Sequence, residues 1–396
     1  MTGDRGFSIV EVAVAMGLLL GVAAVVFALI EPGQASYSVQ LESADMQQRL
    51  RVAAGTLSKD LIMAGAGTSR GPHPGPMSYF FAPILPYRHG ADDSDPPGSF
   101  RRDTITVMYV PATFAQATIA TAGPSGALEA VQVNHDPGCP VDDPSCGFRR
   151  GMTVLIYDAA GDYDTFTVAG ADAATLQLES TRSTLTYPGY PPGTPIAELV
   201  HIVYSLKPDP ISGSNRLVAT EGGAGAQVPV VDHVAGLTFT YYGDPRPPVL
   251  TANPLGEPPG PWTTYGPAPP RFDEHIPSGT YPNGENCAFA VDVVGGVHVP
   301  RLPSLAPADT NGRVPIGESV LTDGPWCPDP TNAHRWDADL LRIRSVAVTI
   351  RIESANTALR GPAGVLFARG GTSRSGNRWL PDQEVTFEVS PRNLGR

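Results

Sequence analysis

The stretch GFSIVEVAVAMGLLLGVAAVVFALI, which runs from Gly6 to Ile30, decides the fold of the amino-terminal part of the chain. Its last 19 residues, from Val12 to Ile30, contain no charged side chain. At about 1.5 Å per residue, a helix of this length nearly crosses the hydrocarbon layer of a membrane, which is about 30 Å thick. The stretch therefore predicts one membrane-embedded helix near the start of the protein.

Two general classes of protein fit this segment only in part. A secretory signal peptide would be cut before Ser36, after the small residues Gly33 and Ala35, but such peptides have a positively charged start and an apolar region of about 7–15 residues. An ordinary single-span anchor fits the apolar length and would leave Glu11 facing the lipid headgroups. It does not explain why an ionisable residue borders the span, where it is costly and indicates a functional site.

The six residues from Gly6 to Glu11, GFSIVE, resemble the processing motif of type IV prepilins. In that motif a short polar leader ends in Gly, the mature chain begins with Phe, and Glu is its fifth residue. The resemblance implies that a prepilin peptidase cuts between Gly6 and Phe7 and methylates the new amine of Phe7. It also implies that Glu11 acts in assembly, where its carboxylate meets a Phe7 ammonium of its own chain or of a neighbour. Losing either member of such a desolvated pair leaves the other charge without a partner.

A second helical pattern follows the apolar run. Glu31-Pro32-Gly33 predicts an interruption, because proline lacks the backbone N–H and clashes with the preceding turn. From about Ser36 to Ala64, apolar residues recur at spacings of seven and four, which places them on one helix face: Val39, Met46, Leu50, Leu57 and Leu61. Asp45 and Arg49 predict an ion pair one turn apart, and Gly65 and Gly67 predict the end of the helix.

The remainder of the chain predicts short strands separated by loops, in keeping with its 43 glycines and 42 prolines. The expected strands are rich in Val, Ile, Thr and Tyr: Thr104–Val110, Ala130–Val133, Thr153–Tyr157, Thr165–Val168, Thr175–Leu178, Leu199–Leu206, Gly236–Tyr242, Leu341–Glu353 and Glu384–Val389. The proline-dense stretch Asp244–Cys287 predicts a long loop. Its four aromatic residues either pin that loop to the sheet or contact a partner: Trp262, Tyr265, Phe272 and Tyr281.

Four further segments narrow the resemblance to the PilW-type minor pilins: Asp45–Gly67, Asp103–Val110, Gly151–Asp158 and Val228–Tyr242. The resemblance implies an α+β fold in which a long pilin-type helix, half membrane-embedded and half amphipathic, packs on an antiparallel β-sheet domain with Pro/Gly-rich insertions. It divides the chain into a leader at 1–6, a helix at 7–67 with a transmembrane part at about 12–30, and a β-rich periplasmic or extracellular domain at 68–396. That domain carries an insert at about 244–340.

Four cysteines leave the redox chemistry open. None belongs to a C-x-x-C pair, which disfavours zinc and thioredoxin-like sites. In an exported protein the shortest loops would join Cys139 to Cys146 and Cys287 to Cys327, one of three possible connectivities.

The sequence does not favour an enzyme. It contains no H-E-x-x-H, G-x-S-x-G or Walker motif, and no cofactor or metal is expected. The net charge of −12, with only Lys59 and Lys207 as lysines, disfavours nucleic-acid binding through a generally basic surface. Acidic turns at Asp92–Asp95 and Asp158–Asp164 lack the spacing of a calcium loop.

The interpretation that follows is a structural minor pilin of a type IV pilus, which helps to initiate assembly or to cap the filament. By the resemblance, its partners are the prepilin peptidase, other major and minor pilins, and the inner-membrane assembly platform. The membrane holds it through Val12 to Ile30 before it enters the pilus at the cell surface. Two alternatives stay open: a minor pseudopilin of a type II secretion system, and an exported binding or adhesion module anchored by a single span.

Overall fold

The computed structural model describes residues 8–69, 75, 82–86, 101–126, 128–135, 137–157, 163–180, 189–222, 227–246, 291–294, 297–300, 304–306, 312–321, 326–328, 335–374 and 378–394. These residues form a long amino-terminal helix followed by mostly antiparallel β-structure, which is an α+β architecture. The chain divides into two compact units. The first unit comprises residues 1–51 and 351–384, and the second comprises residues 52–350 and 385–396.

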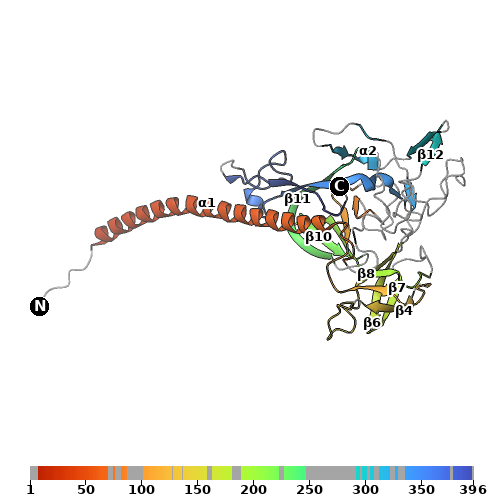
Figure 1. The fold of residues 1–396 in the computed structure, drawn as a ribbon. Helices are drawn as coiled ribbons and strands as arrows, with labels where there is room; N and C mark the ends of the chain where they lie inside the picture. Colours follow the sequence, from red (N-terminus) through yellow and green to blue (C-terminus); the bar gives the residue numbers. More distant parts are fainter. Residues whose placement is uncertain are drawn as a thin grey trace. The chain divides into compact units, whose positions relative to one another are not determined.

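Helix α1 is one continuous element of 55 residues, Ile9–Met63 (Figure 1). The predicted interruption at Pro32 is therefore wrong. The lost backbone donor and the clash at proline are local, whereas helix formation is cooperative over the long segments that lie on either side. The helix stops where Gly65 adopts a φ of 75°, a left-handed conformation that glycine accommodates without steric cost. A Cβ atom at this position would also lie only 3.1 Å from the Pro83 side chain, which would have to shift slightly to make room.

The apolar stripe predicted on the second half of α1 is confirmed. Met46, Leu57 and Leu61 are fully buried, whereas Val39 and Leu50 are half-buried. The Asp45–Arg49 ion pair predicted one turn apart is present as well.

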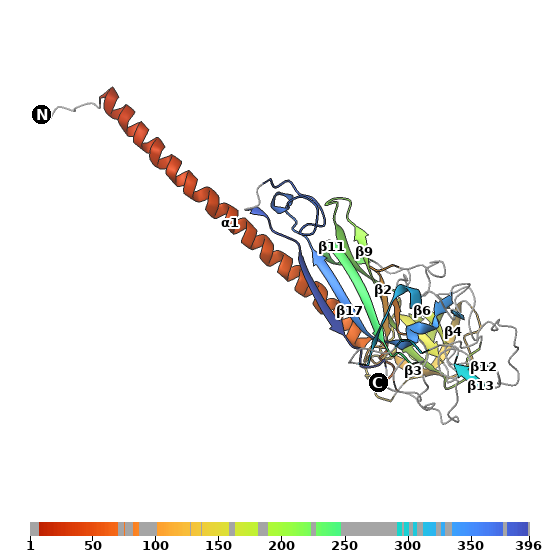
Figure 2. The same cartoon turned by 90° about the horizontal axis from the view of Figure 1, so that it is seen from above.

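The main sheet has eight strands, several of which lie side by side in Figure 2. They are β1 (Ile84–Pro86), β2 (Ile105–Tyr109), β9 (Val200–Pro208), β10 (Asn215–Glu221), β11 (Gln227–Gly243), β14 (Val314–Ile316), β17 (Ile343–Ile352) and β18 (Gln383–Val389). Their order is β1-β2-β9-β10-β11-β17-β18, and β14 pairs with β11. From β1 to β11, each strand runs antiparallel to its neighbour, as does β14 to β11.

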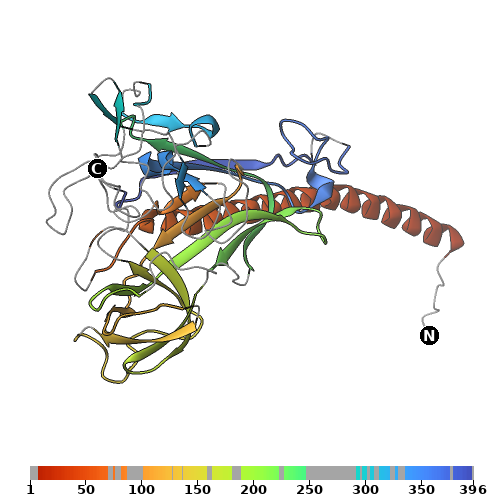
Figure 3. The same cartoon turned by 90° about the vertical axis from the view of Figure 1, so that its right-hand side faces the viewer.

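A closed six-stranded barrel is inserted between β2 and β9 (Figure 3). Its strands are β3 (Gln116–Ile119), β4 (Leu128–His135), β5 (Thr153–Tyr157), β6 (Tyr163–Ala171), β7 (Thr175–Ser180) and β8 (Pro195–Glu198). They follow the order β3-β4-β7-β6-β5-β8 around the barrel. The barrel has its own apolar core, in which Phe148, Phe166 and Tyr190 are fully buried. Closure of the sheet removes the exposed strand edges that would otherwise favour aggregation.

Short elements complete the described structure. Two hairpins pair β12 (Val291–Val294) with β13 (Val297–Pro300) and β15 (Trp326–Pro328) with β16 (Arg335–Asp337). One helical turn, α2, covers Glu318–Leu321. Two 3-10 helices, η3 and η4, cover Ala338–Arg342 and Thr357–Leu359.

All nine predicted strands coincide with observed strands, but several boundaries differ. Strand β11 extends to Gln227, well before the predicted start at Gly236, and residues Ala338–Arg342 form a 3-10 helix where strand was expected from Leu341. The four aromatic residues of the proline-dense loop, from Trp262 to Tyr281, lie outside the described residues.

Candidate functional site

The amino-terminal end of α1 is closed by two hydrogen bonds of Ser8, one to the Glu11 carboxylate and one from the Val10 amide. The Ser8 amide donates to the Glu11 carboxylate over 3.0 Å, and the Ser8 hydroxyl accepts from the Val10 amide over 3.3 Å. This is a capping box of the S-x-x-E type, which satisfies backbone donors that lack partners within the helix. The carboxylate also lies in the first turn, where the helix dipole favours negative charge. The S-x-x-E spacing was readable in the sequence, but the interpretation of Glu11 as an assembly residue overlooked it.

Following this cap, α1 presents an apolar surface. Residues Ile9–Val26 form the helical segment of the described structure that is long and apolar enough to cross a membrane, and none of it is buried within the protein. Ile9 is 88% exposed and Leu20 is 69% exposed. An exposed apolar surface of this size marks an interface with lipid or with other apolar groups.

The predicted processing residues Gly6 and Phe7 lie outside the described residues, directly before this cap. The cap and the apolar segment start one and two residues later, at Ser8 and Ile9. The structure thus places Glu11 at the start of the helix but does not place the Phe7 amine.

In the first unit, the loop after β17 holds α1 through Glu42. The Glu42 carboxylate accepts hydrogen bonds from the Ser354 hydroxyl, over 3.0 Å, and from the Ala355 amide. One residue further along the helix, the Ser43 hydroxyl accepts from the side-chain amide of Gln383 over 3.2 Å. The hydrophobic periodicity of the sequence did not indicate these polar contacts.

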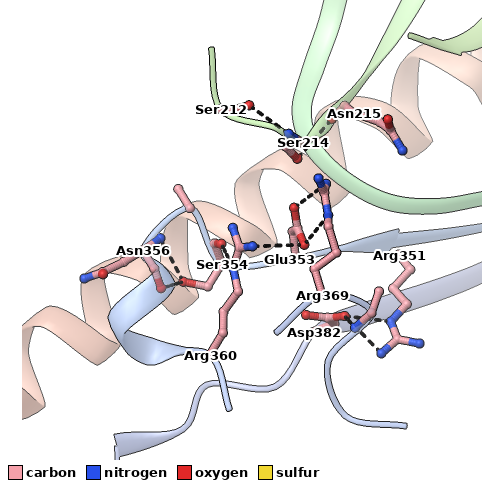
Figure 4. Close-up of polar contacts among 12 residues, drawn as sticks. Ser212, Ser214, Asn215, Arg351, Glu353, Ser354, Asn356, Arg360, Arg369 and Asp382 are labelled. Carbon is pink, nitrogen blue, oxygen red and sulfur yellow. Dashed lines mark hydrogen bonds and ion pairs between the residues drawn. The ribbon is translucent and has the colours of Figure 1, made fainter. Parts of the chain in front are cut away.

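Glu353 organises the same loop (Figure 4). Its carboxylate is fully buried and forms a bidentate pair with Arg369, at 2.6 and 3.1 Å, and an ion pair with Arg360 at 3.3 Å. Arg360 is also buried and donates to the Ser354 carbonyl over 2.6 Å. Buried charges of this kind require such partners, because desolvation of an unpaired charge is costly. The cluster therefore fixes the shape of the loop that contacts Glu42.

In the second unit, Asp60 connects α1 to the sheet. Asp60 is buried, and its carboxylate accepts hydrogen bonds from the hydroxyls of Tyr109, on β2 at 3.1 Å, and Tyr204, on β9. Burial raises the pKa of both tyrosines above the ordinary range, and the adjacent Asp60 carboxylate adds to the shift. Both hydroxyls therefore stay protonated and able to donate at neutral pH.

A groove lies in the second unit between the last turns of α1 and strand β18. Its volume is about 550 Å³. The helix lines it with small or apolar residues, among them Ala54, Gly55 and Ile62, and β18 contributes Val385 and Phe387. Strand β18 ends the sheet order, so the groove lies beside the last strand of the main sheet.

Cys139 and Cys146 are joined by a disulfide, one of the two short-loop pairings expected from the sequence. The other expected pairing involves Cys287, which lies outside the described residues. Of the two acidic turns considered for calcium, Asp92–Asp95 lies outside the described residues, and Asp164 is the one aspartate of the second turn that the structure describes. That carboxylate is fully buried and accepts a hydrogen bond from the Tyr190 hydroxyl over 2.8 Å, which gives it a structural role in the barrel.

Comparison of the chain with known protein families, with characterised proteins and with solved structures returned no match. Three features of the described residues bear on function: a capped apolar helix, its polar attachments, and the groove beside β18.

Proposed function

We propose that this protein is a minor pilin that is inserted into a type IV pilus, where it initiates assembly or caps the filament. The observation that carries the proposal is the apolar surface of Ile9–Val26, which is unburied in the protein, begins directly after Ser8 and carries Glu11 in its first turn. This segment starts within the GFSIVE motif, whose resemblance to prepilins predicts cleavage between Gly6 and Phe7.

The apolar segment suits a protein that moves from a bilayer into a helical filament. Its 18 residues correspond to about 27 Å of helix, close to the thickness of the hydrocarbon layer. Lipid covers the segment before assembly, and the apolar helices of neighbouring subunits cover it afterwards. Either environment removes the same surface from water, so transfer between them does not expose it.

Glu11 has two functions in this proposal. In the uncut precursor its carboxylate accepts a hydrogen bond from the Ser8 amide and closes the amino-terminal end of the helix. Cleavage before Phe7 would create an ammonium one residue before Ser8, at the end of the helix that already favours an anion. The carboxylate then compensates this charge, or the equivalent charge of a neighbouring subunit, in a poorly solvated environment.

The polar attachments of α1 explain how the helix could carry force. Asp60 binds two strands of the sheet through Tyr109 and Tyr204, and Glu42 binds the loop after β17. A subunit extracted from a membrane through its helix needs such attachments, because the sheet domain must follow the helix. The groove between α1 and β18 supplies a surface of small and apolar residues against which a neighbouring subunit can pack.

Two alternative functions differ from this proposal in the process that the protein would serve. A minor pseudopilin of a type II secretion system would use the same helix and cap. A membrane-anchored binding module is favoured by one observation, the inserted barrel, which has its own closed sheet and its own core and could recognise a ligand independently of any filament.

Fractionation of the native host tests the proposal. The protein should appear in filaments sheared from wild-type cells, and deletion of its gene should reduce surface piliation while leaving the secretion of exoproteins intact. Loss of secretion with normal piliation would assign the protein to a pseudopilus. Retention of the whole population in the membrane, with normal piliation in the deletion strain, would favour the anchored module and contradict the proposal.

A further inference from the structure

The barrel carries a cluster of metal-binding side chains that the proposed function does not use. His135 is the last residue of β4, and Cys139 and Cys146 lie in the connection between β4 and β5. One ligand atom from each of the three residues lies within 4.8 Å of the other two. A single cation could therefore contact all three after small side-chain movements.

The imidazole of His135 is the most informative member of this cluster. Both ring nitrogens are buried, and within the described part of the chain neither meets the distance and angle of a normal hydrogen bond, although the Ala173 backbone lies near the ring. Buried polar atoms without a partner are rare, because each loses its hydrogen bonds to water. The neutral imidazole is the form of histidine that binds a metal.

The loop between the two cysteines is held in shape by Asp143. Its carboxylate accepts hydrogen bonds from the guanidinium of Arg149 at 2.6 Å, from the Ser145 hydroxyl at 2.8 Å and from the Gly147 amide at 2.9 Å. The hydrogen bond from Arg149 holds the pKa of Asp143 well below its usual range. These contacts do not involve the sulfur atoms, so the loop has supports that survive opening of the disulfide.

We propose that His135, Cys139 and Cys146 form a redox-gated zinc site. In the oxidised protein the two sulfurs are joined to each other and are not available as thiolates. The thiolate is the form of cysteine that binds metals. Reduction by a dithiol breaks the S–S bond, yields two thiols and leaves the reductant as a disulfide. Zinc then replaces the two thiol protons, which are released to solvent, and the neutral imidazole supplies the third ligand.

The donor set selects the type of cation. Two thiolates and one imidazole suit Zn²⁺, which is bound in this way at sites that keep a fourth position for water. Asp143 is occupied by Arg149, Ser145 and Gly147, so it is not the fourth ligand. The proposal adds a property of the barrel to the proposed function and does not depend on it.

Zinc binding to the full-length protein in detergent provides the test. Cys287→Ser and Cys327→Ser are introduced first, so that Cys139 and Cys146 are the remaining thiols. Zn²⁺ is then titrated into oxidised and phosphine-reduced protein in competition with a chromophoric chelator, and Co²⁺ is used in parallel because thiolate ligation produces a charge-transfer absorption. Reduced protein should bind one zinc ion per chain and show the cobalt signal, and oxidised protein should do neither.

Two variants separate this site from non-specific thiol binding. His135→Ala should lower the zinc affinity of the reduced protein at least about tenfold, since loss of even an outer-shell partner costs about 10–100-fold. His298→Ala, in the β12–β13 hairpin, should leave the affinity unchanged. Zinc should also protect Cys139 and Cys146 from alkylation, read by peptide mass spectrometry. Equal zinc affinity in His135→Ala and in the parent protein, or zinc binding that persists in Cys139→Ser/Cys146→Ser, would overturn the proposal.

Discussion

The backbone amide of Ser8 donates a hydrogen bond to the carboxylate of Glu11 over 3.0 Å. This contact separates two functions of Glu11 that the sequence motif combines. A carboxylate or a carboxamide can accept the hydrogen bond of a capping box, but only the carboxylate can neutralise an ammonium. Substitutions can therefore distinguish closure of the helix from charge compensation.

We expect Glu11→Gln to reach the membrane at the wild-type level but to enter filaments poorly, because the cap is kept while the charge is lost. Ser8→Ala is the matched control. It removes the capping hydroxyl at a cost of about 1 kcal/mol of helix stability but keeps the charge, so incorporation should stay near the wild-type level. Immunoblots of sheared filaments and of membranes measure both. Wild-type incorporation of Glu11→Gln would refute a role for its charge.

The contact of Asp60 with two tyrosines should contribute strongly to the stability of the second unit. Asp60→Ala leaves the buried hydroxyls of Tyr109 and Tyr204 without this acceptor, and we expect a loss of about 2–4 kcal/mol. Urea unfolding of the full-length protein in detergent, followed by circular dichroism, provides the measurement. The control Asp172→Ala removes an exposed carboxylate and should change stability by less than about 0.5 kcal/mol. Similar unfolding midpoints for the two variants would show that Asp60 does not anchor the helix.

Removing Glu353 should loosen the loop between β17 and β18. Glu353→Ala leaves the buried guanidinium of Arg360 without its carboxylate partner, a change that typically costs about 3–5 kcal/mol. Hydrogen exchange of the peptides between residues 354 and 374 should become faster, and exchange in the barrel should not change. Arg374→Ala, at an exposed position of the same loop, is the control and should leave exchange unchanged. Unaltered protection in Glu353→Ala would contradict the organising role of this carboxylate.

The buried tyrosines predict a loss of stability at alkaline pH. Burial raises the pKa of Tyr157 to about 12, although the hydrogen bond with Thr68 opposes the shift. Because the folded-state pKa lies above the unfolded value of about 10, the stabilising contribution is complete below about pH 10 and is lost between about pH 10 and about pH 12.

A spectroscopic titration checks this assignment. Tyrosinate absorbance of the native protein should show a late-titrating fraction, and Tyr157→Phe should remove part of it. The control Tyr37→Phe changes an exposed tyrosine and should leave the late fraction intact. If Tyr157→Phe instead reduced the absorbance change near pH 10, the burial argument for this residue would be wrong.

The sequence predicted those parts of the fold that depend on local periodicity. The stripe that includes Met46 and Leu57 and the Asp45–Arg49 pair follow from residue spacing, and the centres of nine strands follow from their content of Val, Ile, Thr and Tyr. It did not predict continuity of α1 through Pro32, because the propensity of one residue is outweighed by the cooperativity of the long flanking helix.

The sequence did not predict the contacts between residues that are far apart in the chain. Closure of the barrel pairs β3 with β8, and their residues are separated by the whole inserted module. The Asp60 contacts with Tyr109 and Tyr204 bring together residues 49 and 144 positions apart. Neither spacing produces a periodic signal. The capping role of Glu11 is different, because Ser8 and Glu11 lie three residues apart and the S-x-x-E pattern was present in the sequence.

Mass spectrometry of the mature amino terminus, on protein isolated from the native host, tests the central claim most directly. The proposal predicts a terminal peptide that begins with N-methylated Phe7 and retains Glu11 and the apolar segment that follows. A terminal peptide that begins at Met1 or at Ser36 would contradict pilin-type processing and would leave a membrane-anchored or secreted β-rich binding protein.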